Sequence, residues 1–104
     1  MSEPYDCMLT LAVPASLAEE ICDHLLQHPQ WVSGFSVMPA EGFGVGSRPH
    51  TTLEQVRGRA NRRLLQLLMH ACDVEPLLAS LRAEYHSDEM AWWTLPVNGF
   101  GRFT

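Results

Sequence analysis

The strongest constraint on the fold of this chain is an internal repeat. A shift of 57 residues carries Pro39 onto Pro96, and it superimposes residues 39–44 on residues 96–101 with the shared pattern P-x-x-G-F-G. The same shift places Ile21 on Leu78, two apolar positions of helical segments. A chain of 104 residues that repeats itself once is expected to fold as two copies of one supersecondary unit.

Hydrophobic periodicity gives the elements of that unit. Apolar alternation predicts strands, and apolar residues at helical spacing predict amphipathic helices. Ser16 and Glu19 form the pattern of a capping box, and Asp73 is the expected N-cap of the second helix. The expected elements are, in order, strand 7–13, a helix from 16 that stops before Pro29, strands 35–40 and 62–69, helix 73–85 and strand 90–97.

This order predicts an α+β fold, the ferredoxin-like β-α-β-β-α-β sandwich, with an antiparallel sheet and two helices on one face. The plan has the strand order 4-1-3-2, so the prolines at 39 and 96 fall on edge strands, where a missing N–H is tolerated. Leucines on both faces of strand 62–69 and the neighbouring Trp92 and Trp93 make the second sheet face apolar. We expect an oligomer to cover that face; the alternative is a loop or tail folded over it.

Composition narrows the class of function. The net charge of −5 argues against nucleic-acid binding, and no apolar run approaches the roughly 20 residues that cross a bilayer. Three scattered cysteines and an acidic N-terminus without a signal-peptide pattern indicate the cytoplasm. We expect a single domain over residues 1–104 that is cytoplasmic and does not insert into membranes.

The segment of about residues 41–61 is the first candidate site, because loops of this length in small domains are often functional or flexible. It combines glycines, which let a backbone approach an anion, with arginines, whose guanidinium groups fit carboxylates and phosphates; five of the seven arginines lie within residues 48–63. The chain has no lysine, which excludes a P-loop. A solvated, charge-balancing loop is the alternative. The candidate ligand- or partner-binding residues are Gly42, Gly44, Arg48, Arg57, Arg59 and Arg62.

The helix 16–28 carries the second candidate site. His24 and His28 are four residues apart and share one helix face with Glu20, the spacing at which two imidazoles can hold a divalent metal ion. Two ligands are fewer than a closed site needs, and solvated side chains are the alternative. No catalytic constellation stands out, because Cys7 and Cys22 fall on apolar faces and no G-x-S-x-G elbow is present. We therefore expect no enzymatic activity.

The whole chain resembles the PII-like superfamily, and most closely a small bacterial branch of it. Residues 41–44 (EGFG) are similar to the start of the T-loop of PII signalling proteins. Further similarity lies in residues 6–11, 32–35 and 54–59 and in the aromatic strand before Pro96. The resemblance implies a regulatory homotrimer, a small ligand bound between subunits, and a T-loop at 42–59 that docks on a partner such as a membrane transporter. It also implies a context of heavy-metal efflux.

Two departures separate this chain from PII signalling proteins. PII proteins carry a modifiable tyrosine in the T-loop. The tyrosines of this chain, Tyr5 and Tyr85, both lie outside that segment. The loop at 86–89 is acidic where PII proteins hold nucleotide phosphates, which argues against ATP. The ligand stays open, with a divalent metal as one candidate. The alternative function is a metal-binding accessory protein that resembles the CutA-type relatives, in which the histidines matter more than the arginines.

Overall fold

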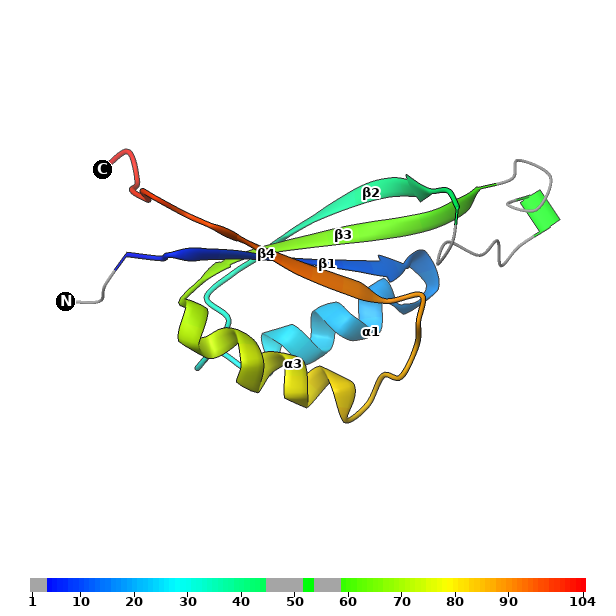
Figure 1. The fold of residues 1–104 in the computed structure, drawn as a ribbon, viewed down its shortest axis with the longest axis horizontal. Helices are drawn as coiled ribbons and strands as arrows, with labels where there is room; N and C mark the ends of the chain where they lie inside the picture. The colour runs from blue at the N-terminus through cyan, green and yellow to red at the C-terminus, as the bar shows by residue number, and fades with distance from the viewer. Residues whose placement is uncertain (1–3, 45–51, 54–58) are drawn as a thin grey trace.

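The computed structural model describes residues 4–44, 52–53 and 59–104. Within these residues the order of elements is β-α-β-β-α-β with one short 3-10 turn (Figure 1). The elements are β1 (Cys7–Pro14), α1 (Ala15–Leu26), β2 (Ser36–Gly42), β3 (Ala60–Met69), η1 (Ala71–Asp73), α3 (Val74–Arg82) and β4 (Ala91–Pro96). Each predicted strand and helix is present, with ends that differ by a few residues.

The four strands form one antiparallel sheet in the order β2-β3-β1-β4, which confirms the predicted topology. β1 and β3 lie in the centre and contain no proline within their paired interior, while Pro39 and Pro96 lie on the edge strands β2 and β4. An edge strand leaves one row of N–H groups unpaired, so proline is tolerated there. The sheet therefore takes the order that its prolines allow.

Both helices cover the same face of the sheet (Figure 1). The sheet residues on this face alternate along the central strands and are fully buried, as the period of a half-covered strand requires. They meet the apolar stripes of α1 and α3, and each such leucine contributes roughly 1.5–3 kcal/mol on burial. The core residues that are at most 1% exposed include Leu9, Val13, Ile21, Leu25, Leu65, Leu67, Met69 and Leu77.

The opposite face carries no other element of the described chain. The pairing of Thr10 with Trp93 and of Leu11 with Trp92 puts the two indoles on opposite faces, as predicted. Trp93 and Leu95, on the open face, are 42% and 50% exposed. At the centre of this face Thr10 is buried, and its hydroxyl has no hydrogen-bond partner among the described residues. The open face is apolar, as the sequence predicts.

The predicted capping box at Ser16 is wrong, whereas Asp73 is the N-cap residue of α3 as predicted, although its side chain forms no cap bond. α1 begins at Ala15, so Pro14 is its N-cap residue and Ser16 lies inside the first turn, where no side-chain cap bond forms. Asp73 is the N-cap residue of α3, but its φ of −91° and ψ of −8° are helical, because η1 leads directly into α3. A capping side chain needs an extended backbone to reach the free N–H groups. Asp73 instead faces His70, with 3.8 Å between its Oδ2 and the histidine Nδ1.

Candidate functional site

The base of the first candidate site is an extension of the β2–β3 pair. The two strands pair as far as Gly42 and Ala60, so this end of the sheet continues two residues beyond the predicted end of each strand. Arg59 lies next to Ala60 and forms an ion pair with Glu41, with 2.9 Å between Nη1 and Oε2. Both side chains are partly exposed, so the pair is expected to be worth less than about 1 kcal/mol. Arg59 is thus placed at the rim of the paired strands, in a partly exposed ion pair.

The two glycines of this site have different environments. Gly42 is buried at the end of β2, paired with Ala60. Gly44 has a φ of +83°, a left-handed conformation that favours glycine, and no atom would touch a Cβ there. Phe43 between them is 63% exposed. The predictions that name Arg48 and Arg57 fall outside the described residues.

Arg62 lies apart from Arg59. It is 8% exposed, and its Nη2 donates to the backbone carbonyl of Glu89, in the connection that precedes β4. This contact fixes the connection between α3 and β4 to the sheet. Arg62 therefore has a structural contact of its own, and its predicted role in ligand binding stays a prediction.

A hollow is lined by residues of the N-terminal and C-terminal segments, among them Tyr5 and Phe100. The two chain ends lie at the end of the sheet opposite to the β2–β3 base (Figure 1). The hollow measures about 910 Å³, and Tyr5 forms its aromatic wall with Phe100 at a ring-centroid distance of 4.8 Å. The Tyr5 hydroxyl donates to Ser33 Oγ over 2.6 Å, and the guanidinium of Arg102 lies 5.4 Å from the Phe100 ring. Because Arg102 is at this end, it cannot join Arg59 and Arg62 within one chain.

The histidines of the second candidate site do come together. His24 and His28 lie on consecutive turns of α1 and its C-terminal end, with ring centroids 4.8 Å apart. Both Nε2 atoms face one hydroxyl: Ser80 Oγ on α3 is 2.7 Å from His24 Nε2 and 3.3 Å from His28 Nε2. The other nitrogen of His24, Nδ1, is 3.4 Å from Glu84 Oε2. Glu20, the third residue of the sequence hypothesis, has no contact in this set.

Sequence reasoning missed the partners on α3 and the burial of His24. His24 is 7% exposed, whereas the sequence left a solvated side chain as the alternative. The signal was present in the repeat, because the 57-residue shift carries His24 onto Leu81, which is also buried. Ser80 lies three residues after Leu77, so it faces α1 from the edge of the apolar stripe. We define the α1–α3 cluster as His24, His28, Ser80 and Glu84.

The α1–α3 cluster presents two imidazole nitrogens to one side, which suits a ligand of low coordination number. A carboxylate at Nδ1 fixes the tautomer of a histidine and turns the Nε2 lone pair toward the ligand side. The described residues contain no group of three or more His, Cys, Asp or Glu side chains that could hold a metal ion. Nearby, burial and then the charges of Glu20, Glu84 and Asp23 raise the pKa of Tyr85. The surroundings of the cluster are therefore acidic and attract cations.

In the part of the chain that the structure describes, no helix is both long and apolar enough to cross a membrane.

Several solved structures share this fold. A DUF3240 family protein from Shewanella baltica OS155 is 20% identical over 100% of both chains, with a TM-score of 0.71. A putative PII-like signalling protein from Thermus thermophilus is 20% identical, with a TM-score of 0.61 and coverage of 93% of this chain and 91% of the other. CPII from Thiomonas intermedia K12, solved with ADP, AMP and acetate, is 18% identical, with a TM-score of 0.55 and 94% of each chain covered.

These likenesses show that the fold is the PII-like, ferredoxin-like fold. A search of curated proteins gave no match. The model of one family, described as protein of unknown function (DUF3240), matches residues 3–104, almost the whole chain. The chain therefore belongs to the DUF3240 family, and its fold is that of PII-like proteins.

Proposed function

We propose that this chain is a PII-like regulatory protein without enzymatic activity, a single cytoplasmic domain that assembles as a homotrimer. It binds a small ligand where subunits meet and docks on a partner protein, a membrane transporter in a heavy-metal efflux system, through the segment 42–59. The observation that carries the proposal is the paired β2–β3 base, which ends in Arg59 and Glu41 and supports that segment. The PII-like fold of the solved neighbours supports it independently.

The open sheet face supports assembly. Trp93 and Leu95 expose apolar area there, and the buried Thr10 hydroxyl at its centre lacks a partner among the described residues. Covering apolar surface gains about 25 cal/mol for each Å² removed from water. A second and third copy of the same chain would present the same face, as closed symmetry requires.

The hollow near Tyr5 supports a ligand site between subunits. It is wide open, and it combines aromatic walls with the positive charge of Arg102. The base at Arg59 is at the opposite end of the sheet in the same chain (Figure 1). In a trimer the two ends can meet only between neighbouring chains, so the ligand would lie at a subunit boundary.

The test separates assembly from ligand binding. Light scattering should give the mass of three chains, and ADP, AMP and ATP should be titrated in turn, with the melting temperature as the measurement. The Arg57→Ala/Arg59→Ala variant should keep the trimer and lose the response to whichever nucleotide stabilises the protein. A monomeric mass, or a response that survives this double substitution, would contradict the proposal.

The second candidate function is metal binding, in the manner of an accessory protein that resembles the CutA-type relatives. It is favoured by one observation: the Nε2 atoms of His24 and His28 converge on Ser80 Oγ. A divalent ion placed between the two Nε2 atoms would find two imidazole ligands on a common side. His24 Nδ1 lies 3.4 Å from Glu84 Oε2, and a carboxylate at the second ring nitrogen is a common partner of metal-bound histidines.

The histidine double variant His24→Ala/His28→Ala tests this second function, with Ser80→Ala as the matched control. Zinc, copper, nickel and cobalt should each be added to metal-stripped protein, with bound metal measured after dialysis. If the imidazoles are the ligands, Ser80→Ala retains the metal and the double variant loses it. Equal metal content in the wild type and the double variant would exclude the site.

A further inference from the structure

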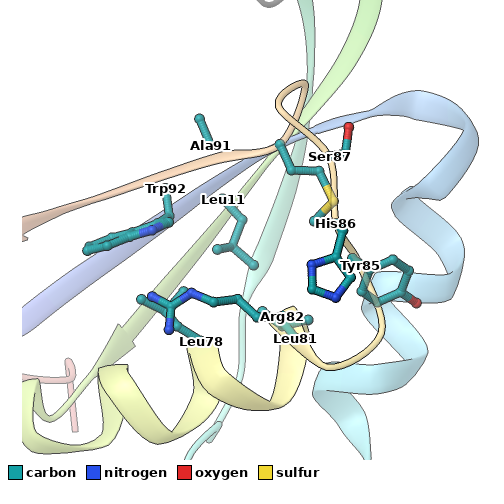
Figure 2. A pocket seen from close by; sticks show the side chains of 10 residues that line it. Leu11, Leu78, Leu81, Arg82, Tyr85, His86, Ser87, Ala91 and Trp92 are labelled. Atoms are coloured by element: carbon teal, nitrogen blue, oxygen red, sulfur yellow. The ribbon is translucent and has the colours of Figure 1, made fainter.

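A small pocket opens between α3 and the edge strand β4 (Figure 2), and one of its lining residues, Tyr85, has its ring 6.3 Å from the ring of His24 in the α1–α3 cluster. The pocket measures about 270 Å³, and it lies on the helix-covered side of the sheet, opposite to the open face. Its floor is aliphatic and buried, made of Leu11, Leu78 and Leu81. Assembly through the open face would leave this pocket accessible.

The pocket exists because α3 ends too early to cover β4. The helix stops at Arg82, and the chain then crosses to Ala91 before the strand begins. Trp92 faces the helix side of the sheet, yet it is 48% exposed. A half-exposed indole above an aliphatic floor leaves apolar area that a planar ligand can cover.

The pocket lining carries positive charge at one position and no negative charge among the described residues. Arg82 is its one permanently charged side chain, and no carboxylate lines the pocket among the described residues. In Figure 2 the Arg82 guanidinium and the Trp92 indole lie at one end of the pocket, and the Tyr85 and His86 rings lie at the other. Arg82 is held by Glu75, with 2.7 Å between Nη1 and Oε1, and this pair is exposed. A guanidinium has five N–H donors, so one such bond leaves donors for a second anion.

We propose that this pocket binds a small aromatic monocarboxylate. The ring would lie on the aliphatic floor against Trp92, and the carboxylate would pair with Arg82 in the fork geometry that arginine favours. The pocket volume of about 270 Å³ fits a ligand with one ring and a short side chain, because a dry cavity of about 150 Å³ already admits benzene. This site uses neither the segment 42–59 nor the hollow near Tyr5.

The experiment titrates the full chain with 3-phenylpropionate and, separately, with the uncharged 3-phenylpropan-1-ol. Binding is measured by calorimetry, and the site by amide and indole NMR shifts. We expect shifts at Leu78, Leu81 and Trp92 and at least tenfold tighter binding of the acid than of the alcohol. Arg82→Gln should remove that preference, because it leaves the apolar walls in place.

Two further variants make the test specific. Glu75→Gln removes the anion that competes for Arg82, so it should tighten the binding of the acid severalfold and leave the alcohol unchanged. Trp92→Ala should weaken both ligands at least tenfold, whereas Trp93→Ala, its neighbour on the other sheet face, should not. No binding of either compound at millimolar concentration, equal effects of the two tryptophan variants, or shifts centred elsewhere would overturn the proposal. Each of these outcomes leaves the regulatory function untouched, because that function is tested with nucleotides and with Arg57 and Arg59.

Discussion

The hydroxyl of Ser80 is predicted to hold the two helices together, so Ser80→Ala should lower the free energy of unfolding. The substitution leaves His24 Nε2 without the partner at 2.7 Å, in a side chain that is 7% exposed. A buried polar atom that loses its partner costs about 1–3 kcal/mol. Alanine returns roughly 0.5 kcal/mol through its higher helix propensity. The expected net loss is about 0.5–2.5 kcal/mol.

Urea unfolding at a fixed protein concentration measures this loss, with an unchanged m-value as the sign that the folded and unfolded states are comparable. Ser16→Ala is the matched control, because Ser16 is an exposed helical serine whose side chain makes no cap bond. It should change the free energy of unfolding by less than about 0.5 kcal/mol. If the two variants were equally stable, the hydrogen bond in the α1–α3 cluster would contribute nothing.

A double-mutant cycle with His24→Leu isolates the contact. Leucine is the residue that the repeat places at the equivalent position, Leu81. Replacing both polar partners by apolar side chains can be nearly neutral, so the double variant should be more stable than Ser80→Ala alone. Coupling of about 0.5–3 kcal/mol is expected for residues in contact, and additive losses would refute the argument.

The remaining predictions concern other parts of the chain. Leu95→Asp should reduce the assembly to a monomer in light scattering, whereas Leu26→Asp, on an exposed part of α1, should not; equal masses would place the interface elsewhere. Gly44→Ala should cost about 1 kcal/mol in urea unfolding because its φ is +83°, and a gain in stability would contradict that conformation. Burial, with a smaller effect of Asp6, raises the pKa of Cys7 above its ordinary 9.0, so stability should fall as the pH rises past 9.0, where the unfolded thiol loses its proton first. Cys7→Ala should flatten that decline in denaturation measured against pH, and the exposed Cys72→Ala should leave it unchanged; the same slope in both would exclude the thiol.

The fold was predictable because the forces that set it leave a period in the sequence. Alternation marks β1, and the leucines on both faces of β3 follow from a sheet with an open apolar side. The positions of Pro39 and Pro96 agree with a single strand order. Helix starts were not predictable in the same way, because capping depends on one backbone angle. At Asp73 that angle is set by η1, a turn that has no periodic signal.

The candidate sites were predictable only in part. The spacing of His24 and His28 on one helix is local, so the sequence finds it. Ser80 and Glu84 approach them across 52 or more residues of chain, and the packing angle of α1 on α3 decides that contact. The pocket beside Trp92 could not be predicted from the sequence, because it depends on where α3 ends relative to β4.

The two copies of the P-x-x-G-F-G motif have different environments, because one lies at the end of β2 and the other at the end of β4. After β4 the chain runs beside the residues that precede β1, where Val97 N donates to Asp6 O over 3.0 Å, and Phe100 packs on the Tyr5 ring. After β2 the chain leaves the sheet at its other end, and Phe43 is 63% exposed. Phe100 thus packs within the subunit, whereas Phe43 is largely exposed among the residues that the structure describes. Phe43 is available for contact with another molecule, next to Arg59 at the end where the proposed docking segment begins.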